Sequence, residues 1–237
     1  MLDTSFERPL GDAGNPASWP FPVKIERVER AYANDVVTGR FTNYSTFLEK
    51  VNSLRASGCI CVTSTCGFLA RLPVSKRLLD EEFVVLSTLL RYRALQRNLG
   101  GERKIGILTI DQSSIDQEIR ENCGIEPDAI IVSPPRDGHF CRAILDAAHP
   151  LELRQAEEEM VHTALRAQRE FPQIGLWLFE CANMPPYRAA VERATGVPVY
   201  DALRLGIELH TGTMARLRQT QTVTNPSDAQ ARYGRES

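Results

Sequence analysis

The sequence lacks long hydrophobic runs, and neither sign of charge dominates it. Its apolar stretches fall well short of the roughly 20 residues that span a bilayer, and its polar, proline-containing amino-terminal region has no hydrophobic segment of the secretory kind. The chain carries 28 basic and 30 acidic residues, a net charge of −2, and no basic run typical of nucleic-acid or lipid binding. We therefore expect a cytoplasmic protein with no membrane or nucleic-acid partner, and a small molecule as its default ligand.

Cysteine is also scarce, with six in 237 residues. This is too few for a disulfide scaffold, and without a secretory signal we expect the thiols to stay reduced. Cys59 and Cys61 share one face of an apolar run, so we expect them to be small core residues. The spacing lacks a CxxC pair, and the sequence has no second pair of cysteines or histidines to complete a zinc site, so we expect no metal site. Cys123 ends a predicted helix.

Cys141, in the run His139-Phe140-Cys141, is expected to be structural, as is Cys123. That leaves Cys66 and Cys181. Each follows a short apolar run that is apolar on both faces, and each opens a helical segment. The same layout of strand, cysteine, helix and strand therefore occurs twice in the chain.

Apolar runs and helical periodicity alternate along the sequence. Strands are predicted at 58–62, 83–86, 104–110, 129–132, 175–179 and 197–200. Helices are predicted at 41–54, 66–72, 87–99, 113–122, 151–171, 187–194 and 201–217. Alternating strands and helices predict an α/β fold with mainly parallel sheets flanked by helices. Residues 1–23, rich in Gly, Pro and aromatics, are expected to form an ordered loop over a pocket; 24–33 is left open, and 220–237 is expected to fray.

The two cysteines have a physical reason to form one site. Open α/β sheets bind ligands at the carboxyl ends of their strands, so duplicated halves would bring both thiols to a shared cleft. Unpaired N–H groups at a helix start favour a thiolate and can hold a carboxylate; the residues concerned are Gly67, Phe68, Ala182 and Asn183. One thiolate would remove the proton α to a carboxylate while the opposite thiol returns one, inverting the carbon without a cofactor. The alternative is two inert core thiols.

Three segments carry a resemblance to a known family: 63–70 (TSTCGFLA), 180–187 (ECANMPPY) and 195–201 (TGVPVYD). They are similar to the active-site segments of the aspartate/glutamate racemase superfamily, and the opening residues 2–16 resemble an uncharacterised branch of it close to aspartate and hydantoin racemases. The resemblance implies two similar lobes, 1–98 plus 206–237 and 99–205, with the active site between them and with neither pyridoxal phosphate nor metal. It implies that Cys66 and Cys181 are catalytic, that Gly67, Phe68, Ala182 and Asn183 hold the substrate carboxylate, and that Asn15 and Thr65 line the pocket.

The chain also departs from the family pattern. Only Met1 and Leu2 precede Asp3, where the family has a complete strand, so we expect a clipped first strand or a start further upstream. The Thr-His that follows the second cysteine in glutamate racemases is absent, which argues against glutamate as substrate. Arg40 is a candidate partner for a second carboxylate, although a surface arginine is the simpler interpretation.

The sequence therefore predicts a cofactor-independent racemase or epimerase acting on an amino acid or related small carboxylate. A decarboxylase or cis-trans isomerase of the same superfamily, or a non-catalytic carboxylate-binding protein, stays open as an alternative. The exposed face of 41–54 is a candidate surface for a homo-oligomer.

Overall fold

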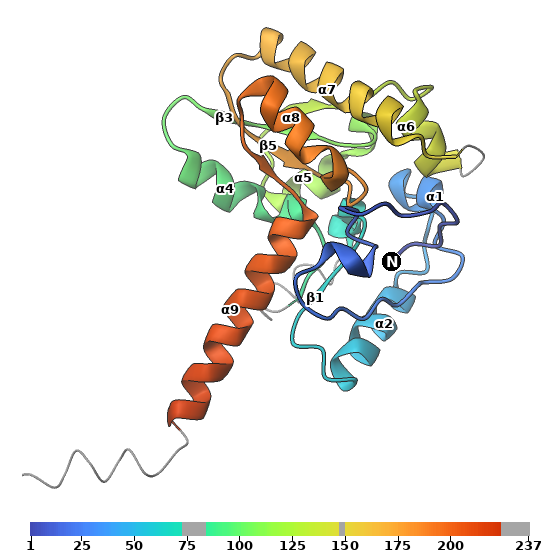
Figure 1. Cartoon of the computed structure of the whole chain (residues 1–237), viewed down its shortest axis with the longest axis vertical. Coiled ribbons are helices and arrows are strands. Elements are labelled where there is room, and N and C mark those ends of the chain that lie inside the picture. Colours follow the sequence, from blue (N-terminus) through green and yellow to red (C-terminus); the bar gives the residue numbers. More distant parts are fainter. Residues whose placement is uncertain (73–83, 147–149, 224–237) are drawn as a thin grey trace, which may run out of the picture.

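The computed structural model describes residues 1–72, 84–146 and 150–223. Parallel strands flanked by helices confirm the predicted α/β class (Figure 1). The larger sheet has the order β4-β3-β5-β6, all parallel. Its strands are β3 (Lys104–Leu108), β4 (Ile130–Val132), β5 (Ile174–Phe179) and β6 (Val199–Tyr200).

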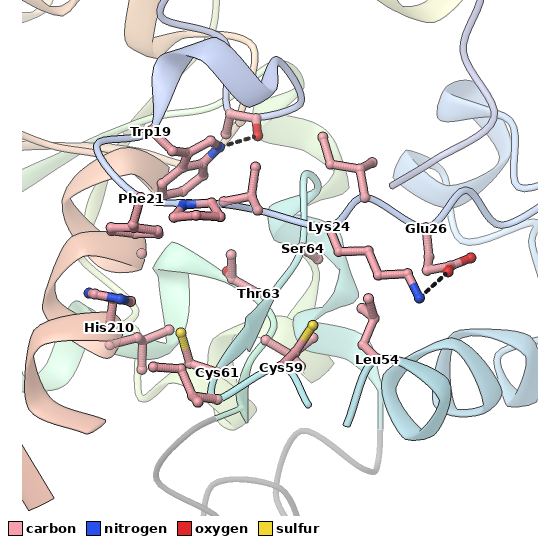
Figure 2. A pocket seen from close by; sticks show the side chains of 18 of the residues that line it. Trp19, Phe21, Lys24, Glu26, Leu54, Cys59, Cys61, Thr63, Ser64 and His210 are labelled. Atoms are coloured by element: carbon pink, nitrogen blue, oxygen red, sulfur yellow. Dashed lines mark hydrogen bonds and ion pairs between the residues drawn. The ribbon is translucent and has the colours of Figure 1, made fainter. Parts of the chain in front are cut away.

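A second, two-stranded parallel sheet pairs β1 (Val62–Thr63) with β2 (Val84–Val85). Both strands are shorter than predicted. The predicted residue Phe83 lies outside the described residues. The expectation that Cys59 is a core residue is wrong, because it is half-buried and lines a pocket beside β1 (Figure 2); Cys61 lines the same pocket and is also half-buried, but packs against the hydrophobic core.

The α-helices are α1 (Ala33–Val37), α2 (Ser45–Ala56), α4 (Tyr92–Leu99), α5 (Gln117–Cys123), α6 (His139–Cys141), α7 (Leu153–Glu170), α8 (Arg188–Thr195) and α9 (Ala202–Val223). Shorter 3-10 turns are η1 (Pro16–Ser18), η2 (Gly67–Arg71), η3 (Thr88–Arg91), η4 (Gln112–Ser114) and η6 (Pro185–Tyr187), and η5 (Arg142–Asp146) is a π-helical turn. Helix α9 projects away from the body of the protein (Figure 1). Among the described residues, no helix combines the length and apolarity needed to cross a membrane.

The helix predicted over 66–72 is the 3-10 turn η2, and the one predicted over 87–99 is divided into η3 and α4. The sequence analysis missed the turns of α6 and η5, because 133–138 gave no periodic signal leading into them. Of the predicted frayed end, 224–237 lies outside the described residues. The division into two lobes stays a prediction.

Of residues 24–33, for which no element was predicted, 24–28 run beside the amino terminus without regular secondary structure; Glu29 and Arg30 form a turn, and Ala33 begins α1. The Val28 N–H donates to the Met1 carbonyl (2.9 Å), and the Asp3 N–H donates to the Ala31 carbonyl (3.0 Å). These bonds follow a parallel strand pattern, and Asp3 forms an isolated parallel bridge with the next residue of the segment. The first residues of the chain are thereby fixed to the two-stranded part of the fold.

A buried arginine ties η2 to its neighbours. Arg71 donates from Nε to the Asp116 carboxylate (2.8 Å) and from Nη2 to the Ser114 carbonyl (2.7 Å). Its Nη1 donates to the carbonyls of Val36 and Val37, both at 3.0 Å. Because a buried cation is stable only when its donors are satisfied, these bonds hold the segment after the first cysteine in one position.

Candidate active site

Cys66 lies at the carboxyl end of β1 and is the residue that precedes η2. The Ser64 hydroxyl shapes this loop: it accepts from the Cys66 N–H (3.2 Å) and donates to the Leu86 carbonyl beyond β2 (2.5 Å). The backbone N–H groups of Phe68 and Leu69 point to the Cys66 sulfur and favour its ionised form. The loop therefore presents a thiol and two backbone donors at one point.

Cys181 follows β5 in the same way, two residues after the strand ends. Its thiol donates to Asn183 Oδ1 (3.4 Å), and the Asn183 backbone N–H points back to the sulfur. Asn183 is itself held by its Nδ2, which donates to Asp12 Oδ2 (2.6 Å). Helix α8 and the turn before it begin only at Pro185, so a turn and not a helix follows this cysteine.

Both cysteines line one small cavity, and each is only 6% exposed. The cavity volume is about 20 Å³, enough for about one water molecule. Burial and Glu180 are the main causes that raise the pKa of Cys181, and a charge on Cys66 would raise it further. Among the residues predicted for the site, those that line the cavity are Thr65, Cys66, Phe68, Cys181 and Asn183.

The other three predicted residues do not line this cavity. The Gly67 N–H faces the Glu180 carboxylate, and the Ala182 carbonyl accepts from the Ala13 N–H (3.1 Å). Asn15 caps the turn η1 through its side chain. These residues support the loops around the cavity.

Glu180 is an acidic residue in the wall of the cavity, and it is not among the predicted site residues. Its carboxylate is 2% exposed, accepts from Thr109 Oγ1 (2.9 Å) and lines the cavity with both thiols. Burial raises its pKa from 4.5 to about 7, although the surrounding donors oppose the rise. A charged residue directly after a buried apolar strand is the signal that could have identified it. Gly67 has no room for a side chain here, since a Cβ would lie 2.5 Å from Glu180 Oε1.

The expectation of stable thiolates is wrong for the unliganded protein. Burial, followed by the charge of Glu180, raises the pKa of Cys66 to about 12. The same two causes raise the pKa of Cys181 well above its ordinary value. The backbone donors after each strand are present as predicted, but they come from short turns and do not outweigh the effect of burial on the pKa. Both sulfurs are therefore neutral thiols near neutral pH.

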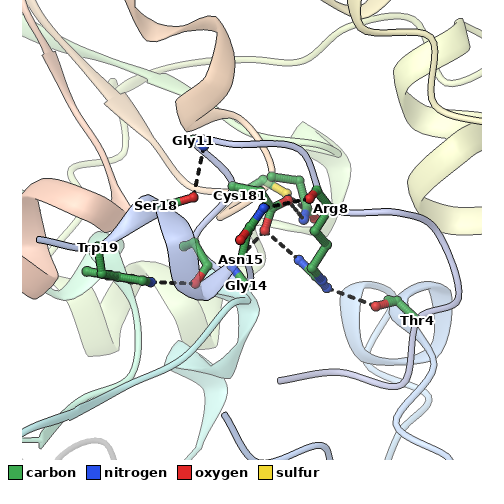
Figure 3. A network of polar contacts seen from close by, with 11 residues as sticks. Thr4, Arg8, Gly11, Gly14, Asn15, Ser18, Trp19 and Cys181 are labelled. Atoms are coloured by element: carbon green, nitrogen blue, oxygen red, sulfur yellow. Dashed lines mark hydrogen bonds and ion pairs between the residues drawn. The ribbon is translucent and has the colours of Figure 1, made fainter. Parts of the chain in front are cut away.

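The amino-terminal loop closes the cavity with a polar network (Figure 3). Arg8 donates to Asp12 Oδ1 (2.8 Å) and to Thr4 Oγ1 (2.8 Å), while Asn15 Nδ2 donates to the Arg8 carbonyl (2.9 Å). Arg8 and Thr4 both line the cavity. This arginine was missed by the sequence analysis because the loop around it has no periodic pattern.

Arg40, the arginine that the sequence offered for a second carboxylate, lies on the surface. Its side chain is 59% exposed and pairs with Asp35 (3.0 Å). Thr65 differs from the other polar side chains of the wall, since its Oγ1 is buried with no hydrogen-bond partner among the described residues. The cavity wall therefore contains a hydroxyl without a partner among the described residues, Thr65, and a guanidinium, Arg8, that is already paired with Asp12. Within the described residues, no group of three or more His, Cys, Asp or Glu side chains is placed to hold a metal ion.

Comparison with known proteins shows two sets of similarities, and no family model matches the chain. A dimethylsulfoniopropionate lyase of Durusdinium sp. clade D is 28% identical over 212 residues, which covers 85% of this chain and 69% of that protein. Dimethylsulfoniopropionate lyase 7 of Emiliania huxleyi is 26% identical over 216 residues, covering 85% of this chain and 62% of that protein. The chain thus spans about two thirds of the length of these relatives.

Among solved structures, unliganded arylmalonate decarboxylase matches with a TM-score of 0.52 at 17% identity, covering 84% of this chain and 86% of the other. The relatives and this structural neighbour are enzymes by name. The chain therefore has the fold of the aspartate/glutamate racemase superfamily, as its cysteine segments predict.

Proposed function

We propose that this protein is a lyase that removes the proton α to a carboxylate and expels a sulfur leaving group from the β-carbon. The substrate class is a small β-sulfonio carboxylate such as dimethylsulfoniopropionate. Two findings support the proposal: the lyases to which the chain is similar over 85% of its length, and a closed cavity that holds two thiols and a buried carboxyl.

The first step is binding of the substrate carboxylate. Arg8 and the unpartnered Thr65 hydroxyl supply donors on one side of the cavity. The N–H groups of Phe68 and Asn183, which line the cavity, supply donors at the cysteine loops. These donors stabilise the negative charge that moves onto the carboxylate oxygens when the α-proton leaves, which is where electrostatic catalysis acts most strongly.

The second step is removal of the α-proton by a thiolate. Since both thiols have raised pKa values, one of them first transfers its proton to Glu180, whose pKa of about 7 suits a proton acceptor near neutral pH. The transfer leaves the net charge of the cavity unchanged. It also removes the carboxylate charge that opposed thiolate formation.

The third step is the elimination itself. The Cα–H bond breaks, a Cα–Cβ double bond forms, and the Cβ–S bond breaks with its electron pair leaving on sulfur. The products are an unsaturated carboxylate and a neutral sulfide, and the α-proton stays on the thiol. Glu180 then releases the proton that it accepted, which returns the site to its starting state. Departure of the sulfide is assisted because the sulfonium charge is neutralised. The atoms and electrons of this step therefore balance without a cofactor.

Racemisation is the second candidate, because two thiols share one cavity while an elimination needs only one base. A substrate without a β-leaving group would be reprotonated by the opposite thiol. A decarboxylase, the activity named for the structural neighbour, would instead release carbon dioxide. The cavity has room for about one water, so each reaction requires that wall residues move when substrate enters.

The test is to incubate the protein in D2O with dimethylsulfoniopropionate, and separately with chiral amino acids, hydantoins and arylmalonates. Gas chromatography then measures sulfide release and NMR measures deuterium at the α-carbon. We expect sulfide release, lost in at least one of Cys66→Ser and Cys181→Ser, the one that replaces the base, and retained in Cys123→Ser, which replaces a buried thiol outside the cavity. Deuterium uptake with an intact carbon skeleton and no sulfide would establish the racemase instead, and carbon dioxide release would establish the decarboxylase.

A further inference from the structure

The two thiols of the cavity differ in the hydrogen-bonding groups that face them. The Cys181 thiol donates to Asn183 Oδ1 (3.4 Å), so an acceptor holds its proton, and one backbone N–H, that of Asn183, faces its sulfur. The Cys66 sulfur is faced by two donors, the backbone N–H groups of Phe68 and Leu69. Because donors stabilise a thiolate and an acceptor stabilises an S–H group, the surroundings of Cys66 favour its ionisation more than those of Cys181 do.

Asn183 is fixed so that its oxygen, and not its NH2 group, faces the Cys181 thiol. Its Nδ2 donates to Asp12 Oδ2 (2.6 Å), and Asp12 is fully buried. Reversing the amide would bring Asn183 Oδ1 against this carboxylate, leaving two acceptors in contact in a buried place, which is costly. Asp12 is held in turn, since its Oδ1 accepts from Arg8 Nη1 (2.8 Å) and from the Gly14 N–H (2.7 Å). Asp12 therefore determines which atom Asn183 presents to the sulfur.

The charges around the two thiols differ in the same direction. Burial, followed by the charge of Glu180, raises the pKa of both thiols. Among the remaining charges, Arg71 lowers the pKa of Cys66, whereas Asp12 raises the pKa of Cys181. Hydrogen bonding and charge thus agree that Cys66 gives up its proton more readily.

We propose that Cys66 is the base of this site and that Asp12, acting through Asn183, keeps Cys181 as a neutral thiol. The assignment rests on the proposed function, because it names the thiol that carries out the second step. The Cys66 S–H proton passes to the Glu180 carboxylate, and the Cys66 thiolate then takes the α-proton while the Cβ–S bond breaks with its electron pair leaving on sulfur. Cys181 keeps its own proton throughout. Asp12 does not line the cavity, so it is a positioning residue.

Asp12→Asn tests the positioning role while nearly preserving the shape of the side chain. The oxygen of the new amide is expected to keep the donors from Arg8 and Gly14, so that its NH2 group faces Asn183. Asn183 then reverses its own amide, accepts from that NH2 group and turns Nδ2 toward the Cys181 sulfur. The variant therefore replaces the acceptor at this thiol with a donor and removes a nearby negative charge.

The measurement is alkylation of the unliganded protein by iodoacetamide at about pH 9, with each thiol followed by mass spectrometry of its peptide. We expect Asp12→Asn to accelerate labelling of Cys181 at least about tenfold relative to Cys66, the change in thiolate fraction that one pKa unit gives. Cys66 in the same molecule is the control for a general opening of the cavity.

Asn183→Ala is the second variant, because it removes the acceptor from Cys181 and leaves Asp12 in place. We expect it to accelerate labelling of Cys181 relative to Cys66 as well, and circular dichroism shows which variants fold. An unchanged ratio of the two labelling rates in a folded variant would overturn the proposal.

Sulfide release from dimethylsulfoniopropionate separates failure of this assignment from failure of the proposed function. We expect Cys66→Ser to lower kcat/KM at least about 100-fold. Cys181→Ser is expected to cause a loss at least about tenfold smaller, because serine still donates to Asn183 Oδ1. A larger loss in Cys181→Ser would overturn the assignment and leave the lyase standing. No release from the unsubstituted protein would overturn the proposed function, whereas the labelling ratios test the role of Asp12 without substrate.

Discussion

Replacing Glu180 by Gln removes the charge that opposes both thiols while keeping nearly the same shape. Burial raises the pKa of Glu180 from 4.5 to about 7, and at about 1.4 kcal/mol per pKa unit this corresponds to about 3 kcal/mol. Because the folded protein holds this proton more tightly than the unfolded chain, the free energy of unfolding falls as pH rises from 4.5 to about 7. Above that pH range, ionisation of Glu180 lowers the free energy of unfolding by this full amount. Below it, Glu180 is protonated in both states and does not lower the free energy of unfolding.

Glu180→Gln is therefore expected to remove this loss. The difference in Tm between this variant and the unsubstituted protein should increase between about pH 5 and pH 8. A free-energy difference of about 3 kcal/mol corresponds to roughly 6–12 °C. The charged hydrogen bonds that the variant loses would reduce this increase. Calorimetry across this range measures the difference, with Glu158→Gln as a control for an exposed carboxyl. Parallel pH profiles of Tm for the Glu180 variant and the unsubstituted protein would refute the reasoning.

The remaining predictions concern the cavity wall and its supports. Arg8→Lys should lower kcat/KM at least about tenfold, measured by sulfide release, because lysine cannot donate to Asp12 and Thr4 at once with a planar guanidinium; equal rates would contradict its binding role. Arg71→Met should lower the free energy of unfolding by about 3–5 kcal/mol in denaturant titrations, because it leaves buried carbonyls and Asp116 without their donor; a loss under about 1 kcal/mol would contradict this. Alkylation of Cys66 should stay slow at neutral pH and accelerate toward alkaline pH, since its pKa is about 12; rapid labelling at neutral pH, followed by mass spectrometry, would show a stable thiolate.

Much of the fold could be predicted because the signals are local. Apolar runs such as 175–179 specify buried parallel strands, and their alternation with helical periodicity fixes the α/β class. The two cysteine segments could be matched as a pair because each stands at the end of such a strand. Their meeting on one cavity followed from the rule that ligand sites gather at the carboxyl ends of parallel strands.

What the sequence could not show depends on packing. The ionisation of Cys66 is set by burial and by Glu180, neither of which a motif reveals. Among the described residues, β1 pairs with a strand on one side only, and Cys59 and Cys61 line a pocket beside it. Arg8 reaches the cavity through an irregular loop whose path is fixed by individual hydrogen bonds. The catalytic roles of the two cysteines stay predictions until activity is measured.

The central claim is that the paired thiols serve one cavity in which an α-proton is removed. The measurement that tests it most directly is sulfide release from dimethylsulfoniopropionate carrying deuterium at the α-carbon, compared with unlabelled substrate. The account predicts slower release from the labelled compound, and no release when the cavity cysteine that acts as the base is replaced by serine. Equal rates for the two substrates, with full activity in both serine variants, would contradict it.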